Sequence, residues 1–249
     1  MTEVAMTEEE KYLFDLQGYL AVPDALNAQQ LQSLNSILDE HIAAEMGDKS
    51  THRFGGLLHW GQPYTDLLDN APVVPHLETM LGEHFRLDHI YCDVIRGGLG
   101  PIGATLHGGG TPFDPSQYYN YRDGKMYNGL MVVAYNLHDV NPGDGGFACV
   151  PGSHKANFPF PRQWGNLEEM HPCVRAVTGQ AGTAIIFTEA LTHGALPWHG
   201  QHERRTVFFK YSPHPLSWSK KYFNADDYEG LSERQRHILE PPNARYGYR

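Results

Sequence analysis

The sequence predicts a mainly β protein of the sandwich or jelly-roll class, braced by helices near its N-terminus. Two observations support this prediction. Helical periodicity dominates the N-terminal part of the 249-residue chain, and short apolar runs separated by glycine and proline turns dominate the remainder. That order of elements is typical of a β domain with helices packed against it. We expect one domain over residues 1–249, with a helical N-terminal part (1–87), a jelly-roll core (88–213) and a C-terminal tail (214–249).

Three helices are expected in the N-terminal part. The first begins after Thr7, which forms a capping box with Glu10, and Gly18 is a suitable stop. The second follows Asn27 and keeps its leucines at helical spacing. A third helix is expected over residues 73–81.

The expected strands are short runs rich in β-branched and aromatic residues. They cover residues 19–22, 90–95, 131–140, 183–187 and 206–211. Residues 48–70 are polar and rich in glycine, so we interpret them as a loop, and a short helix is expected near residues 231–239.

Composition excludes several classes of partner. The formal net charge is −10, and such a chain is repelled by phosphate backbones, which argues against nucleic-acid binding. No apolar run is long enough to span a membrane, and the N-terminus lacks the features of a signal peptide. Three cysteines without CxxC spacing indicate no disulfide framework. We therefore expect a cytoplasmic protein with a small-molecule partner; the sequence predicts no oligomeric state.

Two histidines and an arginine are the candidate chemical residues. His107 precedes three glycines, and His193 follows an apolar strand. Either one alone is more often structural than catalytic, but Arg204 follows His193 by eleven residues. Histidine is the commonest metal ligand, and the arginine fork matches a carboxylate. Together they are the parts of a non-haem iron(II) site with a carboxylate co-substrate.

A longer set of motifs resembles a known family. Residues 141–147 read NPGDGGF and residues 150–155 read VPGSHK, while residues 14–20 read FDLQGYL. With His107 and His193, these motifs resemble the phytanoyl-CoA dioxygenase (PhyH-like) family of iron(II)/2-oxoglutarate enzymes. The resemblance extends from Glu8 to Pro213.

The resemblance implies a double-stranded β-helix (a cupin-like jelly roll) that uses Fe(II), 2-oxoglutarate and O2. His107 and His193 would be the catalytic iron ligands, and Arg204 would bind the far carboxylate of 2-oxoglutarate. Side chains alternate along the strand, so Arg204 and Arg205 point to opposite faces. The face of Arg205 looks more like core, and Arg205 remains the alternative to Arg204. His154, in the PGSH turn, is expected to hold the loop.

The chain departs from the family at one position. The family pattern is His-x-Asp, whereas residues 107–109 read HGG, so a halogenase-like His-x-Gly replaces it. One interpretation is an oxygenase that hydroxylates an unactivated C–H bond of a small polar molecule, with water or the carboxylate of Asp114, Glu189 or Asp93 completing the site. A second is a halogenase with chloride in the position left open at Gly109. A third is a jelly roll that binds a ligand without catalysis.

Aromatic residues near the two histidines are the candidates for substrate contact. Residues 111–128 carry several tyrosines with basic residues, so they could form a lid that includes Tyr118 and Tyr119. Trp198 lies just beyond His193 and could approach the same mouth.

Overall fold

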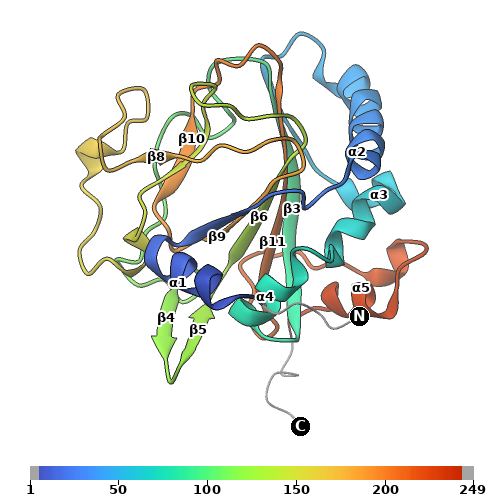
Figure 1. Ribbon diagram of the computed structural model, residues 1–249. Helices are drawn as coiled ribbons and strands as arrows, with labels where there is room; N and C mark the ends of the chain where they lie inside the picture. Colours follow the sequence, from blue (N-terminus) through green and yellow to red (C-terminus); the bar gives the residue numbers. More distant parts are fainter. Residues whose placement is uncertain (1–5, 243–249) are drawn as a thin grey trace.

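Two antiparallel sheets pack face to face in the middle of the molecule (Figure 1). The structure is a computed structural model, and it describes residues 6–242. The large sheet has the strand order β1-β9-β6-β11-β3-β2, and the small sheet has the order β10-β7-β8. Phe147 of β7 packs on Phe187 of β9 with ring centroids 4.5 Å apart, so side chains of both sheets fill the space between them. The predicted jelly-roll class is confirmed.

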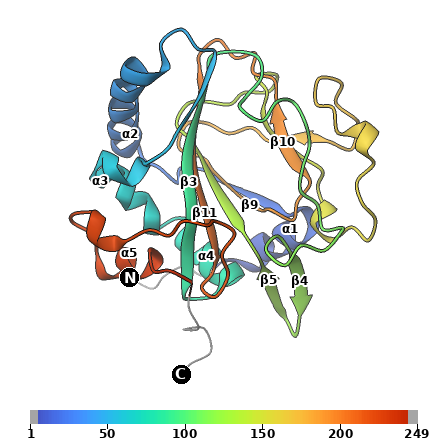
Figure 2. The same cartoon turned by 180° about the vertical axis from the view of Figure 1, so that it is seen from behind.

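The strands of the large sheet come from both ends of the chain. They are β1 (Tyr19–Val22), β2 (Thr51–Phe54), β3 (Phe85–Ile95), β6 (Met131–Asn136), β9 (Ala184–Thr188) and β11 (Arg204–Pro213). The small sheet consists of β7 (Gly146–Cys149), β8 (Arg175–Ala176) and β10 (His193–Leu196), and a separate hairpin is formed by β4 (Tyr119–Arg122) and β5 (Lys125–Asn128). The small sheet lies on the side of the molecule away from α2 and α3 (Figure 2).

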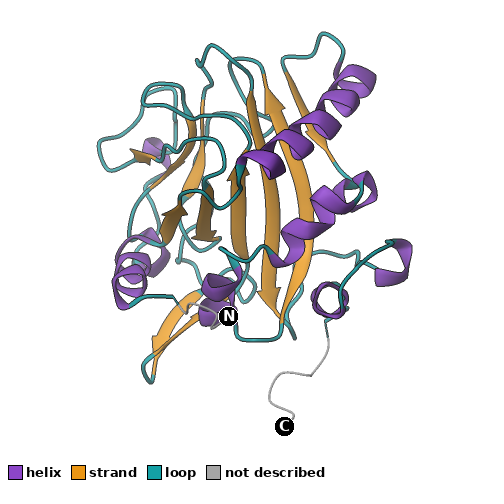
Figure 3. Cartoon of the chain, turned by 45° about the vertical axis from the view of Figure 1, so that its right-hand side comes forward, coloured by secondary structure: helices purple, strands orange, loops and turns teal. Residues whose placement is uncertain are grey.

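Helices cover the outer face of the large sheet (Figure 3). The α-helices are α1 (Glu8–Gln17), α2 (Ala28–His41), α3 (Gln62–Thr65), α4 (Val74–Leu81) and α5 (Glu233–Ile238). A π-helical turn, η1 (Ile42–Met46), extends α2, and the short 3-10 turns are η2 (Leu57–Trp60), η3 (Asp66–Asp69), η4 (Ser153–Lys155), η5 (Arg162–Trp164) and η6 (Ala225–Asp227). Within the described residues, no helix combines the length and the apolar character needed to cross a membrane.

The predicted helix ends are confirmed where the signal is a cap. The Glu10 backbone N–H donates to Thr7 Oγ1 at 3.2 Å, the Glu10 carboxylate accepts from the Thr7 N–H at 2.8 Å, and Gly18 ends the helix with φ of +83°. A second capping box joins Asn27 to Gln30. These bonds connect residues three apart, so they form wherever the local sequence provides them.

Two predicted loops contain regular structure. Residues 48–70 include β2, α3 and two 3-10 turns, and the segment 111–128 contains the β4–β5 hairpin. β2 pairs with β3 through Thr51↔Ile95 to Phe54↔Cys92, so its conformation depends on a strand remote in sequence. A prediction from local periodicity misses a strand of this kind.

Candidate metal centre

His107 and His193 lie side by side at the edge of the small sheet. His193 is the first residue of β10, and His107 forms an isolated bridge with it. Each backbone N–H donates to the carbonyl of the other residue at 2.8 Å. Their ring centroids are 4.2 Å apart. The backbone pairing therefore brings together two histidines that the sequence analysis selected separately.

Glu189 joins the two imidazoles. It follows β9, in the turn that leads into β10, and it is 3% exposed. One ligand atom from each of His107, Glu189 and His193 lies within 4.8 Å of the other two, and Glu189 Oε2 is 3.8 Å from His193 Nε2. Two imidazoles and one carboxylate are the facial set that holds non-haem iron(II). The donor set therefore fits the iron(II) that the sequence resemblance implies.

The hydrogen bond of His193 orients its ring for this role. Nδ1 lies 2.6 Å from the Leu191 carbonyl oxygen, which accepts a hydrogen bond. Because a carbonyl can only accept, Nδ1 carries the proton and Nε2 keeps its lone pair toward Glu189. A metal-binding histidine commonly has its other ring nitrogen fixed in this way.

The electrostatics keep all three groups in the form that binds metal. Burial lowers the pKa of His193 to about 4 and also lowers the pKa of His107. Burial would raise the pKa of the Glu189 carboxyl, but the Lys210 ammonium and the two imidazoles outweigh it and lower that pKa to about 2. At neutral pH the site therefore offers two neutral imidazoles and one carboxylate, the protonation states that metal binding requires.

A cavity extends from this group into the space between the sheets. Its walls include residues of both sheets and of the loop 100–102, and they are Arg53, Tyr91, Asp93, Ile95, Gly100, Pro101, Ile102, His107, Phe147, Phe187, His193, Gly194, Ala195, Arg204, Phe208 and Lys210. Phe147, Phe187 and Phe208 make much of the wall apolar. One strand, β11, contributes Arg204, Phe208 and Lys210, which are spaced by even numbers and so share one face.

The same alternation separates Arg204 from Arg205. Arg204 faces the cavity, is 5% exposed, and its Nε has no hydrogen-bond partner among residues 6–242. Arg205 points to the helical side, where it pairs with Glu203, with Asp39 at 2.6 Å and with the Asn35 side chain at 2.9 Å. Arg205 is thus engaged by protein groups, and Arg204 is the arginine that remains available to a ligand.

Sequence reasoning missed two cations of the cavity wall. Lys210 Nζ lies 2.5 Å from Glu189 Oε1, so the carboxylate directs one oxygen to the lysine and the other toward His193. Arg53 binds both oxygens of Asp93, each at 2.7 Å, and its guanidinium lies 3.9 Å from the centroid of the Tyr91 ring. Lys210 could have been predicted, because it lies an even number of residues after Arg204 on the same strand. Arg53 lay in a segment predicted as loop, and no motif marked it as a site residue.

The structure does not bring Gly109 to this cavity. Gly109 lines a separate pocket with residues 150–153, and its φ is +117°. A Cβ added at Gly109 would approach Thr192 Oγ1 at 3.0 Å. Thr192 precedes His193, and successive residues of an extended segment point to opposite sides. A side chain at residue 109 would thus start on the side away from the His193 ring.

Of the three carboxylates considered for the missing position, the structure brings only Glu189 to the histidines. The Asp114 carboxylate instead accepts from the backbone N–H and the hydroxyl of Ser116, at 2.7 and 2.6 Å. Asp93 lines the same cavity but is held by Arg53.

The aromatic residues predicted to contact substrate lie elsewhere. Tyr118 lines a groove beside α1 and α4, and the Tyr119 hydroxyl donates to the carboxylate of Asp15. Trp198 is 1% exposed, and its indole N–H donates to the His202 carbonyl at 2.6 Å. None of these three residues is among the described residues that line the cavity. His154 also lies outside it, with Nε2 donating to the Asp15 carbonyl at 3.1 Å, as expected for a loop-holding residue.

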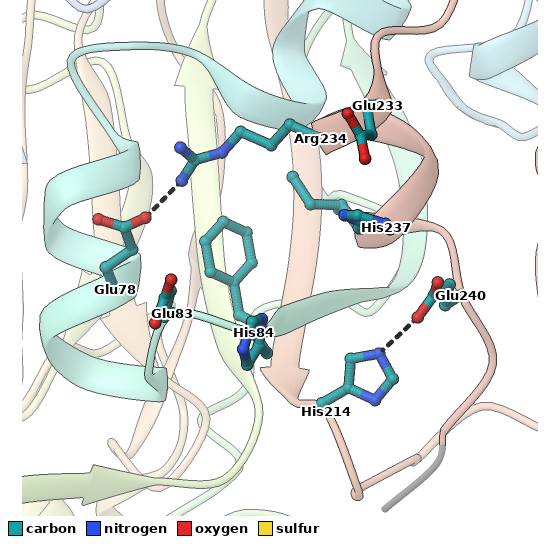
Figure 4. Close-up of a pocket in the computed structure, with 10 residues that line it drawn as sticks. Glu78, Glu83, His84, His214, Glu233, Arg234, His237 and Glu240 are labelled. Carbon is teal, nitrogen blue, oxygen red and sulfur yellow. Dashed lines mark hydrogen bonds and ion pairs between the residues drawn. The ribbon is translucent and has the colours of Figure 1, made fainter. Parts of the chain in front are cut away.

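A second, wider pocket lies between α4 and α5 (Figure 4). Its side chains are largely charged, and two pairs cross it: Glu78 with Arg234 at 2.5 Å, and Glu240 with His214 at 3.3 Å. Among the described residues, the group at His107 is the one whose donors converge closely enough to hold a metal. The cavity between the sheets is therefore the candidate site.

Comparisons with known proteins agree with this location. The sequence model of the family described as phytanoyl-CoA dioxygenase (PhyH) matches residues 103–206, a range that includes His107, Glu189, His193 and Arg204. A search of curated proteins gave no match.

Solved structures resemble almost the whole chain. HygX from Streptomyces hygroscopicus with nickel and 2-oxoglutarate bound is 25% identical, with a TM-score of 0.78 over 91% of this chain and 95% of that one. The iron-bound form of HygX gives a TM-score of 0.75 at 25% identity, over 92% of this chain and 95% of that one. The non-heme alpha ketoglutarate dependent epimerase SnoN from nogalamycin biosynthesis, at 16% identity, shares the fold, with a TM-score of 0.59 over 84% of this chain and 81% of that one.

Proposed function

We propose that this chain is an iron- and 2-oxoglutarate-dependent oxygenase of the PhyH-like kind that hydroxylates an unactivated C–H bond of a small polar molecule, because residues 103–206 match the PhyH family and the fold matches that of HygX. His107, Glu189 and His193 would hold the iron, and Arg204 would bind the far carboxylate of 2-oxoglutarate. When bound, the iron and 2-oxoglutarate supply, with O2, the oxidant for the C–H bond. The proposal extends to this chain the metal and 2-oxoglutarate that HygX binds.

One observation supports this proposal above the others. A two-histidine, one-carboxylate donor set and an arginine whose Nε has no hydrogen-bond partner among residues 6–242 line or border a single cavity. Two other charged pairs involve residues of the cavity wall: Lys210 pairs with Glu189, and Arg53 pairs with Asp93. Among residues 6–242, no ion pair is found for Arg204. A buried, uncompensated guanidinium is costly unless an anion reaches it, and a carboxylate matches its fork.

The chain's own residues would position the reactants and exclude water. Arg204 lies six residues before Lys210 on one strand face, so about 20 Å separates their Cα atoms at the rise of a β-strand. Both side chains line the cavity, as do Phe147, Phe187 and Phe208. A dicarboxylate anchored at Arg204 would extend toward the histidines, in surroundings where water is displaced.

Glu189 favours oxygenation over halogenation. The halogenase hypothesis depended on a site without a protein carboxylate, which would leave room for chloride. Glu189 supplies a carboxylate beside the two histidines and so removes the reason to invoke a halide. HygX has been solved with hygromycin B bound, which supports a small-molecule substrate for this chain as well.

Anaerobic titration tests the proposal. Addition of Fe(II) and then 2-oxoglutarate should produce the weak visible absorption band of an iron–2-oxo-acid chelate. His193→Ala should abolish both metal binding and the band, and Arg204→Met should weaken 2-oxoglutarate binding while metal binding remains. Arg205→Met is the matched control, since that side chain faces the helices, and it should bind metal and 2-oxoglutarate as tightly as the parent. A parent protein that binds neither metal nor 2-oxoglutarate would rule the proposal out.

A further inference from the structure

We propose that Arg53 is a positioning residue that keeps Arg204 free for the co-substrate by occupying both oxygens of Asp93. This inference rests on the proposed role of Arg204. Arg53 lies in the N-terminal part of the chain, outside the segment that matches the family. The inference gives it an indirect role in selecting a dicarboxylate.

The three residues lie on one face of three neighbouring strands. Arg53 of β2 is directly opposite Asp93 of β3, and Asp93 is directly opposite Thr206 of β11. Arg204 lies two residues before Thr206, so it is the diagonal neighbour of Asp93 on the same face. Diagonal neighbours are within reach of long side chains, and all three charged residues line the cavity.

Asp93 would otherwise be a natural partner for Arg204. Both are buried, at 6% and 5% exposure, and a buried carboxylate beside a buried guanidinium normally pairs with it. Burial lowers the pKa of the Arg204 guanidinium, and Asp93 is the carboxylate that most opposes this effect. Arg204 nevertheless has an Nε without a hydrogen-bond partner among residues 6–242.

The fork of Arg53 explains why. Its Nε donates to Asp93 Oδ1 and its Nη2 to Oδ2, each at 2.7 Å, which is the bidentate arrangement that occupies both oxygens. The guanidinium carbon also lies over the Tyr91 ring, 3.9 Å from its centroid, and this cation–π contact adds a second interaction that holds Arg53. Asp93 is thereby neutralised by a residue that is itself held in place.

Loss of Arg53 would redirect Asp93 toward Arg204. A dicarboxylate would then have to displace a protein carboxylate before it could bind. We expect Arg53→Met to raise the Kd for 2-oxoglutarate about tenfold, which corresponds to about 1.4 kcal/mol. A 2-oxo acid without the far carboxylate does not need Arg204, so its affinity should change by less than about twofold.

The experiment is calorimetry on the Ni(II)-loaded full-length protein, with 2-oxoglutarate and 2-oxopentanoate as the two ligands. The variants are Arg53→Met, Arg53→Lys, Asp93→Asn and the double variant Arg53→Met/Asp93→Asn. Arg53→Lys keeps the charge and should retain most of the affinity. Asp93→Asn should bind 2-oxoglutarate at least as tightly as the parent, and the double variant should recover parental affinity because no carboxylate remains to compete.

Unfolding free energy and Ni(II) affinity, measured on the same variants, separate positioning from stability. A purely structural role would weaken both 2-oxo acids equally, or would lower Ni(II) affinity, and either result would overturn the inference. So would a double variant that binds 2-oxoglutarate as poorly as Arg53→Met. If the parent itself does not distinguish 2-oxoglutarate from 2-oxopentanoate, the proposed role of Arg204 fails instead, and the inference fails with it.

Discussion

Replacement of Glu189 by glutamine tests the contribution of this carboxylate to metal binding and to the stability of the fold. Glutamine keeps the size of the side chain and removes its charge, so Lys210 Nζ loses the carboxylate that lies 2.5 Å away. Glu189 is buried, at 3% exposure, and the Lys210 side chain is 13% exposed. The substitution should therefore abolish a metal ligand and leave an ammonium without its counter-ion.

The magnitude follows from the pKa of Glu189. It is lowered to about 2 from an ordinary value of 4.5, because the Lys210 ammonium and the two imidazoles outweigh the effect of burial. At 1.36 kcal/mol for each pKa unit, the surroundings favour the ionised carboxyl over a neutral one by about 3 kcal/mol. We expect the free energy of unfolding of the metal-free protein to fall by that amount, within the range seen when one partner of a buried ion pair is removed.

The assay is urea denaturation of the metal-free protein together with Ni(II) calorimetry. The double variant Glu189→Gln/Lys210→Met is the control, because it removes the stranded ammonium as well. It should regain most of the stability, while metal binding stays at least about a hundredfold weaker than in the parent, since a ligand is missing. Parental Ni(II) affinity in Glu189→Gln, or its recovery in the double variant, would refute Glu189 as the third ligand.

Three further outcomes are expected. Gly109→Asp should lower the free energy of unfolding by about 1–2 kcal/mol, because φ of +117° strains an L-residue, and it should not tighten Ni(II) binding. Chloride should not strengthen 2-oxoglutarate binding to the parent. Tighter Ni(II) binding in the variant, or tighter 2-oxoglutarate binding with chloride, would instead support a ligand position at residue 109. Arg205→Met should destabilise the protein by about 1–2 kcal/mol in urea, yet leave the 2-oxoglutarate Kd unchanged. Burial lowers the pKa of His154 to about 4 from 6.5. As the pH falls, the unfolded chain therefore binds a proton at this residue before the folded protein does. The free energy of unfolding should decline between about pH 6.5 and 4, by about 3 kcal/mol from this residue. His154→Gln should remove that share, measured as the difference in unfolding free energy between pH 7 and pH 4.5; equal acid sensitivity in both proteins would contradict it.

The sequence predicted the parts of the site whose signal is local. His107, His193 and Arg204 could be selected because each is adjacent to a recognisable strand or glycine turn, and the spacing of eleven residues is set by one strand-to-strand connection. The interpretation of Gly109 as an open ligand position rested on the family pattern alone, and the structure places Gly109 in a separate pocket. The sequence left Asp114, Glu189 and Asp93 as alternative carboxylates, and of these the structure brings Glu189, in a turn four residues before His193, beside both histidines.

What the sequence determined by itself was the jelly-roll class, the capped helices and the residues expected to bind metal and co-substrate. Caps and alternation act between neighbours in the chain, so their outcome is decided before any sheet forms. Only the tertiary structure brought Glu189 beside the two histidines and placed Lys210 against its carboxylate. Only the tertiary structure placed Arg53 across Asp93 from Arg204. These choices depend on which strands pair and in which register, and that is determined by packing across the whole domain rather than by any local run of residues.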